Sequence, residues 1–341
     1  MNINTSYLPL VFALILLILT SFTPGVGHHQ SANLDISETP LAPSNNYLTA
    51  ASPEVFGNRN GGDKVLPDSY SPPPKESASE GLKNSSVFSL PPINTYPLRD
   101  WGVLDPKVDV AAALVKDLDS GYIFWNKDSS HRWPIASLTK LMTAIVALEQ
   151  LDTSKEIIVS QNAVTVAGGA GDLKINGSYK IDDLLKIMLL ASSNNAATAL
   201  AEAYFSSEEF VKVMQTKARE LGMSQTTLFD PTGLSVSNQS NSNDLAMLAN
   251  YILKNHPEIF KITTQKNYKD IKNINLFAGR PDFLGGKTGF LEEAGGNLIS
   301  IFKYKDGKFN FPLLIVVLGS KDRFNDTQVL LDWIKEAYSF K

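Results

Sequence analysis

Cysteine is absent from the 341-residue chain. Its absence excludes a disulfide, a thiolate metal site, a cysteine nucleophile and a lipid anchor attached to cysteine. Histidine is scarce as well: two of the four lie together in the N-terminal tail and the other two stand alone, so we predict neither a metal site nor a cofactor. The net charge of −4 is small and gives no reason to expect a nucleic-acid partner.

Charged side chains are missing from the start of the chain, where no Asp, Glu, Lys or Arg precedes Asp35. Residues 7–22 are almost wholly apolar, as in the hydrophobic region of an export signal. Extended to Val26, the run reaches the about 20 residues that a spanning helix needs. We predict that residues 1–27 are a signal peptide or a membrane anchor, and that the protein works outside the cytoplasm. A buried N-terminal helix is the weaker alternative, because a long polar tail follows.

Regular apolar patterning is lacking from residue 28 to residue 97. Ten of the 18 prolines lie between Pro40 and Pro97, and Ser and Asn fill much of the remainder. Such a segment cannot bury enough apolar surface to offset the entropy that it would lose on ordering. We predict a disordered linker over residues 28–97 with no binding role, followed by a folded domain over residues 98–341.

Periodic apolar patterns begin near Val108. Alternation predicts an early pair of strands around a turn at 119–121, and a late pair around the Asp-Gly turn at 305–308. We expect strands at residues 111–116, 122–125, 297–304 and 309–318, and helices at residues 137–151, 181–191, 196–204, 208–221, 243–253 and 326–338. This order predicts an α+β domain, in which one antiparallel sheet lies beside a helical subdomain with a cleft between the two.

Ser137 and Lys140 form the first motif that carries chemistry. Residues three apart share a face of a helix, so we expect the lysine amine near the serine hydroxyl. A serine needs a base to become a good nucleophile, and a lysine serves only when burial or a nearby cation lowers its pKa. The motif alone is weak, because a serine at a helix start with a solvated lysine gives the same pattern.

Two further motifs follow along the chain. Ser192 and Asn194 could relay a proton and hold a substrate amide, although Ser and Asn are also common in loops. Lys287, Thr288 and Gly289 supply a charge, a hydroxyl and an approachable backbone, although an edge strand guarded by a lysine looks the same. In this order, Ser-x-x-Lys, Ser-x-Asn and Lys-Thr-Gly are the motifs of class A β-lactamases and penicillin-binding proteins.

Longer stretches around these motifs resemble the D-alanyl-D-alanine carboxypeptidase family of low-molecular-mass penicillin-binding proteins. The matching stretches are residues 112–117, 120–121, 134–144, 221–223, 229–234, 284–290, 293–295, 316–319 and 323–324. Asn195 departs from the family, which often has an aspartate there, and the spacer precedes the domain, which is less usual. The resemblance implies an α/β fold of the α+β type that is similar to β-lactamases and transpeptidases, with an antiparallel sheet flanked by helices and an α-helical subdomain.

The resemblance also implies the catalytic roles. Ser137 would attack the carbonyl between the two terminal D-alanines of a peptidoglycan stem peptide, with Lys140 as general base. Ser192 and Asn194 would line the opposite wall, with Ser192 passing the proton to the leaving amine. Water would then release the shortened peptide from Ser137. A β-lactam would acylate the same serine as a covalent inhibitor.

The substrate-binding roles are implied in the same way. Lys287 would support Ser192 electrostatically and help to keep the catalytic lysine neutral. Thr288 and Arg323 would bind the terminal carboxylate of the substrate. Gly289 completes the third motif, and the backbone N–H groups of the nucleophile and of Phe290 would form the oxyanion hole.

Three rival functions use the same residues. A class A β-lactamase also needs a deacylating glutamate in a Glu-x-x-Leu-Asn pattern, and none lies between Asn194 and Lys287. A D,D-endopeptidase that cuts cross-links uses the same machinery, so the sequence leaves this alternative open. A catalytically silent wall-binding module would keep the fold alone, which the complete set of polar motif residues disfavours.

Overall fold

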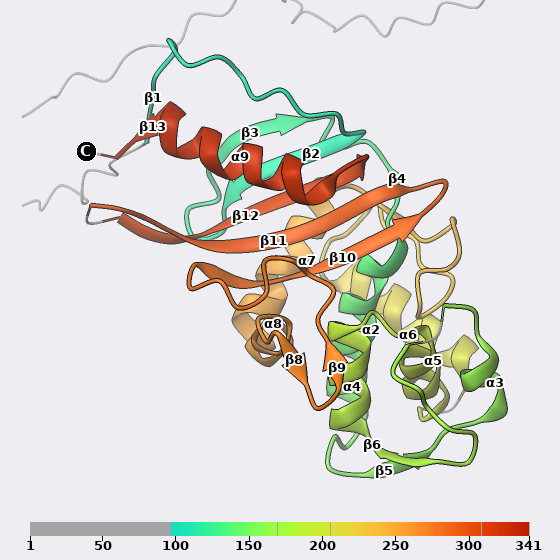
Figure 1. Ribbon diagram of the computed structural model, residues 1–341. Helices are drawn as coiled ribbons and strands as arrows, with labels where there is room; N and C mark the ends of the chain where they lie inside the picture. Colours follow the sequence, from blue (N-terminus) through green and yellow to red (C-terminus); the bar gives the residue numbers. More distant parts are fainter. Residues whose placement is uncertain (1–96, 169, 205, 308, 341) are drawn as a thin grey trace, which may run out of the picture. The chain divides into compact units, whose positions relative to one another are not determined.

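The computed structural model describes residues 97–341, apart from residues 169, 205, 308 and 341 (Figure 1). The predicted signal or anchor and the predicted linker, except for Pro97, lie outside the described residues. Within the described part of the chain, none of the helices is long and apolar enough to cross a bilayer. The boundary between linker and folded domain stays a prediction.

A five-stranded antiparallel sheet forms the centre, in the order β10-β11-β12-β2-β3. Its strands are β2 (Ala112–Asp117), β3 (Ile123–Lys127), β10 (Phe283–Leu291), β11 (Gly295–Asp306) and β12 (Phe309–Ser320). The early and late hairpins join through β2 and β12, where Val115 lies opposite Ile315. The predicted single sheet is therefore confirmed, and β10, which carries Lys287, is one of its edge strands.

Both faces of the sheet are buried. Successive side chains of a strand point to opposite faces, so Leu114 and Val316 face one core while Val115 and Val317 face the other. The first core packs against the helical subdomain, and the second is covered by α9 (Arg323–Ala337), which lies along the sheet in Figure 1. The helices of the subdomain are α2 (Lys140–Gln150), α3 (Gln161–Thr165), α4 (Ile181–Leu190), α5 (Asn194–Glu202), α6 (Ser207–Glu220), α7 (Ser242–Asn255) and α8 (Pro257–Thr263).

Helix boundaries differ from the prediction where a cap or a tight turn decides them. Helix α9 begins three residues early, because the Asp322 side chain accepts a hydrogen bond from the N–H of Asn325. Helix α8 was not predicted and starts with Pro257 at its first position, which suits a residue that lacks an N–H. Ser137 lies in a 3₁₀ turn, η1 (Ala136–Thr139), and the α-helix begins only at Lys140, so the prediction of one helix from residue 137 is wrong at its start.

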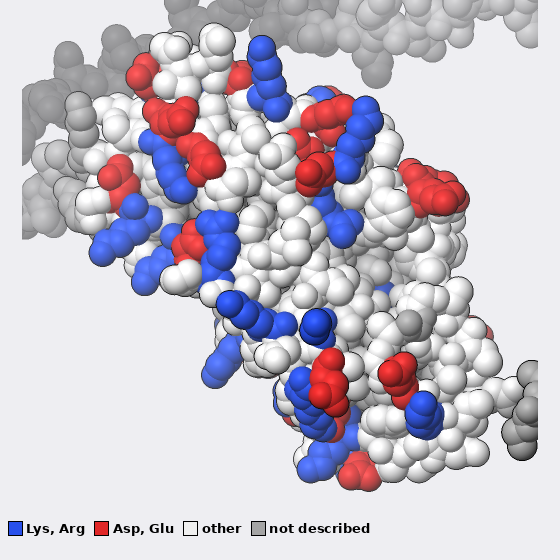
Figure 2. All heavy atoms as spheres, in the orientation of Figure 1, with Lys and Arg blue, Asp and Glu red and all other residues white. Residues whose placement is uncertain are grey.

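Four short two-stranded ladders tie distant segments together. They pair β1 (Leu98–Arg99) with β13 (Tyr338–Ser339), β4 (Trp133–Pro134) with β7 (Gln239–Ser240), β5 (Glu156–Ile158) with β6 (Ser178–Lys180), and β8 (Asn267–Tyr268) with β9 (Ile271–Lys272). The β4–β7 ladder brings the segment before η1, the turn that carries Ser137, next to the segment before α7. On the face shown in Figure 2, acidic and basic side chains are interspersed, so this face carries no continuous band of one sign.

Candidate active site

The turn that carries Ser137 is strained and closely packed. Ala136 adopts φ 49°, a left-handed conformation that costs an L-residue about 1–2 kcal/mol. Ala136 is fully buried while Ser137 is partly exposed, so the turn presents the hydroxyl toward solvent. Lys140 begins the helix that follows, and its Nζ lies 2.9 Å from Ser137 Oγ.

Lys140 is fully buried and has three polar partners. Its Nζ lies 2.7 Å from Asn194 Oδ1 and also contacts the Thr232 carbonyl oxygen, in addition to Ser137 Oγ. A neutral amine has two N–H donors and one lone pair, so it can donate to the amide and the carbonyl while the serine hydroxyl donates to it. Burial lowers the pKa of Lys140 to about 7, although the Asp230 carboxylate opposes this shift. A large fraction of the amine is therefore neutral near pH 7.

The second motif lies in the turn between α4 and α5. Ser192 adopts φ 58°, and Ser193 caps α5 by accepting a hydrogen bond from the N–H of Ala196. Asn194 is buried at the start of α5, where its Nδ2 donates to the Ala167 carbonyl, 2.7 Å away. This bond fixes the amide so that its oxygen faces Lys140.

Asn195 has a structural task that the sequence did not reveal. Its Nδ2 donates to the carbonyl oxygens of Ala163 (2.6 Å) and Val164 (2.9 Å), at the end of α3. An aspartate could not donate these bonds. The departure from the family at this position is therefore matched by an amide that holds α3 against α5.

The third motif lies on β10, and its lysine contacts the serine of the second motif. Lys287 is almost fully buried, and its Nζ donates to Ser192 Oγ and to the Thr288 carbonyl, each 2.8 Å away. Burial holds the pKa of Lys287 well below its usual value, and the charges of Lys140 and Arg323 lower it further. Each of the two serines thus has a buried lysine amine within hydrogen-bond distance.

Three of the four remaining substrate-binding candidates lie along the same strand, β10, and the fourth lies on α9. Thr288 is buried, whereas the Phe290 side chain is 62% exposed. Arg323, at the start of α9, donates from Nη1 to the Gly289 carbonyl at 2.9 Å, and its buried Nε has no partner among the described residues. Gly289 itself lies against the nucleophile turn, since a Cβ there would be 3.2 Å from Ser137 N.

The structure therefore brings Ser137, Lys140 and Asn194 into one hydrogen-bonded group, with Ser192 and Lys287 in a second group beside it. Among the residues that the structure describes, no hydrogen bond joins the two groups directly. In the described part of the chain, no cluster of three or more His, Cys, Asp or Glu side chains could hold a metal ion.

The sequence did not indicate that the loop at residues 230–235 contacts Lys140 and the turn that carries Ser137. Asp230 accepts hydrogen bonds from the N–H groups of Thr232 and Gly233, each at 2.7 Å, and of Ser235 at 2.8 Å. Burial opposes the ionisation of Asp230, but these hydrogen bonds together hold its pKa below the usual value. The loop places the Thr232 carbonyl oxygen where it accepts a hydrogen bond from Lys140 Nζ. The Asp-Pro-Thr-Gly sequence is a turn signal, but nothing in it indicates which surface the turn contacts.

Comparison with known proteins shows the family to which the chain belongs. The family model described as D-alanyl-D-alanine carboxypeptidase matches residues 101–322. The chain belongs to this family. It is 31% identical over 250 residues to the D-alanyl-D-alanine carboxypeptidase DacF of Bacillus subtilis, covering 67% of this chain and 63% of that protein. It is 30% identical over 287 residues to the D-alanyl-D-alanine endopeptidase of Escherichia coli, covering 73% of this chain and 88% of that protein.

Solved structures agree with the family. A D-alanyl-D-alanine carboxypeptidase of Mycobacterium tuberculosis aligns with a TM-score of 0.63 at 25% identity, covering 72% of this chain and 99% of that one. Penicillin-binding protein D2 of Listeria monocytogenes, in its cefotaxime-bound form, aligns with a TM-score of 0.61 at 27% identity, covering 67% of this chain and 98% of that one. The predicted α+β fold of the penicillin-binding proteins is thus confirmed.

Proposed function

We propose that the protein is a serine-type D-Ala-D-Ala carboxypeptidase that removes the terminal D-alanine of peptidoglycan stem peptides. The observation that carries the proposal is the fully buried Lys140 amine, 2.9 Å from Ser137 Oγ and with a pKa of about 7. A hydroxyl next to a partly neutral lysine is the arrangement that nucleophilic acyl transfer needs. The same serine would take up a β-lactam covalently.

Acylation begins when Ser137 Oγ attacks the carbonyl between the two D-alanines. Lys140 accepts the hydroxyl proton as the O–C bond forms, which gives a tetrahedral oxyanion and a charged ammonium. The N–H groups of Ser137 and Phe290 would stabilise this oxyanion, a role that Gly289 supports by lying against the nucleophile turn. Losing one such donor typically reduces the rate about 10²–10³-fold.

Collapse of the tetrahedral intermediate breaks the C–N bond. Ser192 donates its hydroxyl proton to the leaving amine and regains a proton from the Lys140 ammonium, so that D-alanine departs as a neutral amine and Lys140 is neutral again. Lys287 Nζ donates a hydrogen bond to Ser192 Oγ, 2.8 Å away, and this bond stabilises the serine while it is short of a proton. Water, activated by Lys140, then cleaves the ester and restores Ser137.

The terminal carboxylate of the substrate would bind at Thr288 and Arg323. The guanidinium is held in place by the Gly289 carbonyl, and the buried Nε is left with an unused donor. A carboxylate is the natural acceptor for a guanidinium whose donors are only partly satisfied. This binding would select peptides that end at the residue after the scissile bond.

An endopeptidase that cuts cross-links is the second candidate. The observation in its favour is the 30% identity to the Escherichia coli endopeptidase over 88% of that protein. To separate the two, the full-length protein is incubated with a linear stem pentapeptide and, separately, with a cross-linked dimer. The proposal expects D-alanine release from the linear peptide and none in Ser137→Ala. Cleavage of the dimer alone would contradict it and establish the endopeptidase.

We also propose that the protein acts outside the cytoplasm, because its family acts on the cell wall. Export through residues 1–27, by a cleaved signal or a retained anchor, is the proposed route. Fractionation of cells that express the full chain tests it: the protein should reach the outside of the membrane, and its retention in the cytoplasm would refute the proposal.

A further inference from the structure

The outer side of β10 is covered by a helix up to the point where the active site begins. β10 is an edge strand, so every second residue turns its N–H and C=O groups away from β11. Gly286 is such a residue, and its N–H donates to the hydroxyl of Thr263, the last residue of α8, at 3.0 Å. Thr288 and Phe290 follow in the same phase of the strand. Helix α8, which lies under this edge in Figure 1, thus ends where the substrate-binding part of the edge begins.

Two glycines let α8 come this close to the strand. Gly285 has φ 142°, and a Cβ there would lie 2.4 Å from Phe260 Cβ on α8. A Cβ on Gly286 would lie 2.1 Å from the Ile299 carbonyl oxygen on β11. A side chain at either position would push β10 away from the helix or from the sheet. The strand is therefore held between α8 and β11 directly before Lys287.

The Thr263 hydroxyl is engaged on both sides. Its oxygen accepts the hydrogen bond from Gly286, and its proton is donated to the Phe260 carbonyl at 2.8 Å. Thr263 is 1% exposed and Gly286 is buried, so removal of the hydroxyl would leave the N–H of Gly286 without a partner. Such a donor is costly to leave unpaired, and β10 would have to move to find another acceptor.

The end of α8 is also tied to the helix that leads to the second motif. Asn273 Nδ2 donates to the Thr263 carbonyl at 2.8 Å. The N–H of the next residue, Ile274, donates to the carbonyl of Leu190 at 3.1 Å. Leu190 is the last residue of α4, two positions before Ser192. One chain segment thus joins the end of α8 to the end of α4.

We propose that Thr263 is a positioning residue for proton transfer, because it holds β10 at Gly286 so that Lys287 Nζ stays within hydrogen-bond distance of Ser192 Oγ. That distance is 2.8 Å, and it joins the two elements that the end of α8 keeps together. The inference rests on the proposed peptidase function and adds a residue that none of the three motifs contains. Thr263 acts through Lys287 and not on the substrate.

Two substrates that form the same acyl-enzyme can separate proton delivery from the other tasks of β10. One is a peptide that ends in D-Ala-D-Ala, whose leaving nitrogen must take up a proton as the C–N bond breaks. The other is the thioester in which thiolactate replaces the last D-alanine. Its C–S bond breaks to give a thiolate, which needs no proton because a thiol has a pKa of about 8.5. Both substrates keep the terminal carboxylate and the scissile carbonyl, so a change in binding or in the oxyanion hole affects them alike.

Thr263→Val keeps the shape of the side chain and removes the hydroxyl. We expect the ratio of kcat/KM for the amide to kcat/KM for the thioester to fall at least about tenfold in the full-length protein. General-acid catalysis typically contributes about 10²–10⁴-fold, and a displaced Lys287 would lose part of it. Thr263→Ser should keep the ratio within about threefold of the original value, because a serine hydroxyl is the same donor and acceptor.

A second variant reaches the same contact from the other side. Asn273 is only half-buried, and Asn273→Ala removes the bond to the Thr263 carbonyl while the backbone bond of Ile274 to α4 remains. We expect the same ratio to fall about threefold, in line with the loss of one hydrogen bond. This variant carries the test if Thr263→Val does not fold.

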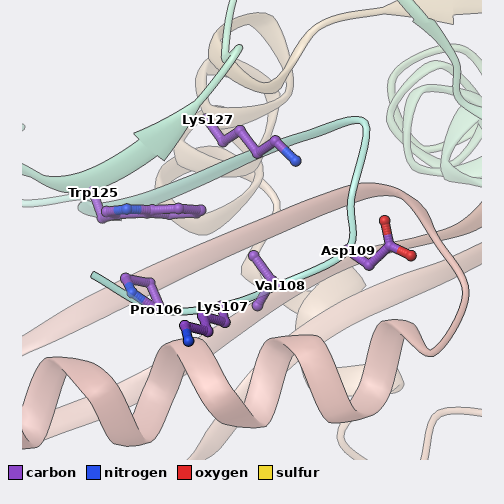
Figure 3. Close-up of a pocket in the computed structure, with 6 residues that line it drawn as sticks. All are labelled: Pro106, Lys107, Val108, Asp109, Trp125 and Lys127. Carbon is purple, nitrogen blue, oxygen red and sulfur yellow. The ribbon is translucent and has the colours of Figure 1, made fainter. Parts of the chain in front are cut away.

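The matched control lies at the opposite edge of the sheet. Lys127 on β3 donates from Nζ to the Val110 carbonyl at 2.8 Å, beside a cavity of about 530 Å³ (Figure 3). Lys127→Met removes one hydrogen bond from a side chain to the backbone, as Thr263→Val does, but far from Lys287. It should leave the ratio unchanged. Urea unfolding of every variant shows which of them are folded.

Three results would overturn the inference. An unchanged ratio in folded Thr263→Val, or in folded Asn273→Ala if the first variant does not fold, would contradict the positioning role while leaving the peptidase intact. Equal losses on the amide and on the thioester would leave Thr263 with a structural role alone. Absence of D-alanine release by the unmodified protein would instead contradict the proposed function, and the positioning role with it.

Discussion

Gly233 is the point at which the supporting loop touches the nucleophile turn, and Gly233→Ala is the substitution whose effect we can work out most fully. Gly233 has φ 83°, and a Cβ there would lie 2.0 Å from the Ala136 carbonyl oxygen and 2.9 Å from Ser137 N. The contact with the oxygen is roughly 1.5 Å shorter than ordinary van der Waals contact. Either the loop or the nucleophile turn must therefore move.

The size of the effect has two parts. A left-handed alanine costs about 1–2 kcal/mol of stability wherever it stands. The displacement comes in addition, and a shift of about 1 Å at a reacting group can lower a rate about 10²-fold. We expect Gly233→Ala to acylate with penicillin at least about 100 times more slowly than the unmodified protein, because Ser137 Oγ and Lys140 Nζ lose their alignment.

Gly222→Ala is the matched control. Gly222 follows α6 with φ 75°, and its nearest neighbour for a Cβ is the Met247 sulfur, 4.0 Å away. This variant also places an alanine in a left-handed backbone conformation, with the same loss of stability, but it contacts no residue of the active site. The assay is the rate of labelling by a fluorescent penicillin, measured beside urea unfolding for both variants. Equal labelling rates in folded Gly233→Ala and Gly222→Ala would refute the idea that this loop positions Ser137.

Four further predictions concern polar groups that are buried or partly buried. The penicillin acylation rate should rise with pH and reach half its maximum near pH 7, because only neutral Lys140 accepts a proton; a rate that is flat from pH 6 to pH 8 would contradict this. Lowering of the pKa of Lys140 from 10.5 to about 7 also means that the unfolded chain binds more protons between these pH values. Unfolding free energy should thus rise by about 3 kcal/mol from pH 7 to pH 9.5 relative to Lys140→Met, measured by urea unfolding. Asn195→Asp should destabilise the protein by about 1–3 kcal/mol, because a carboxylate would face two carbonyl oxygens; an unchanged melting temperature would contradict the role assigned to this amide. Arg99→Ala should cost about 1–3 kcal/mol in urea unfolding, because the guanidinium lies 4.7 Å from the Trp333 ring centre, while the penicillin acylation rate stays the same.

The order of elements could be predicted because it depends on local patterns. The hairpin strands follow alternation, and helices such as α6 follow a period of 3.6 with a glycine at the end, where Gly222 takes φ 75° as expected. Helix α9 was placed three residues late, because the start is set by the Asp322 cap and not by the apolar pattern.

The site could be predicted only as a set of residues. The three motifs name the groups, but their pairing across the sheet and helices depends on packing. Residues 137 and 140 were expected on one helix face, whereas they meet across the junction of a 3₁₀ turn and an α-helix, with Ala136 at φ 49°. The backbone of Ala136 lies against Gly233, which is 97 residues further along the chain, and no local pattern indicates such a contact.

Arg323 is a second residue whose contacts could not be predicted from the sequence. The resemblance suggested it as a carboxylate ligand, but only the structure places its guanidinium on the Gly289 carbonyl, with a buried donor left over.

The central claim is that Ser137 is the acylated nucleophile. The most direct measurement is intact-mass and peptide-mapping mass spectrometry of the full-length protein after incubation with penicillin. We predict one adduct, located on Ser137, and none in Ser137→Ala that is folded by circular dichroism. An adduct on another residue would contradict the account, and folded protein without any adduct would contradict it and leave a silent wall-binding module as the better description.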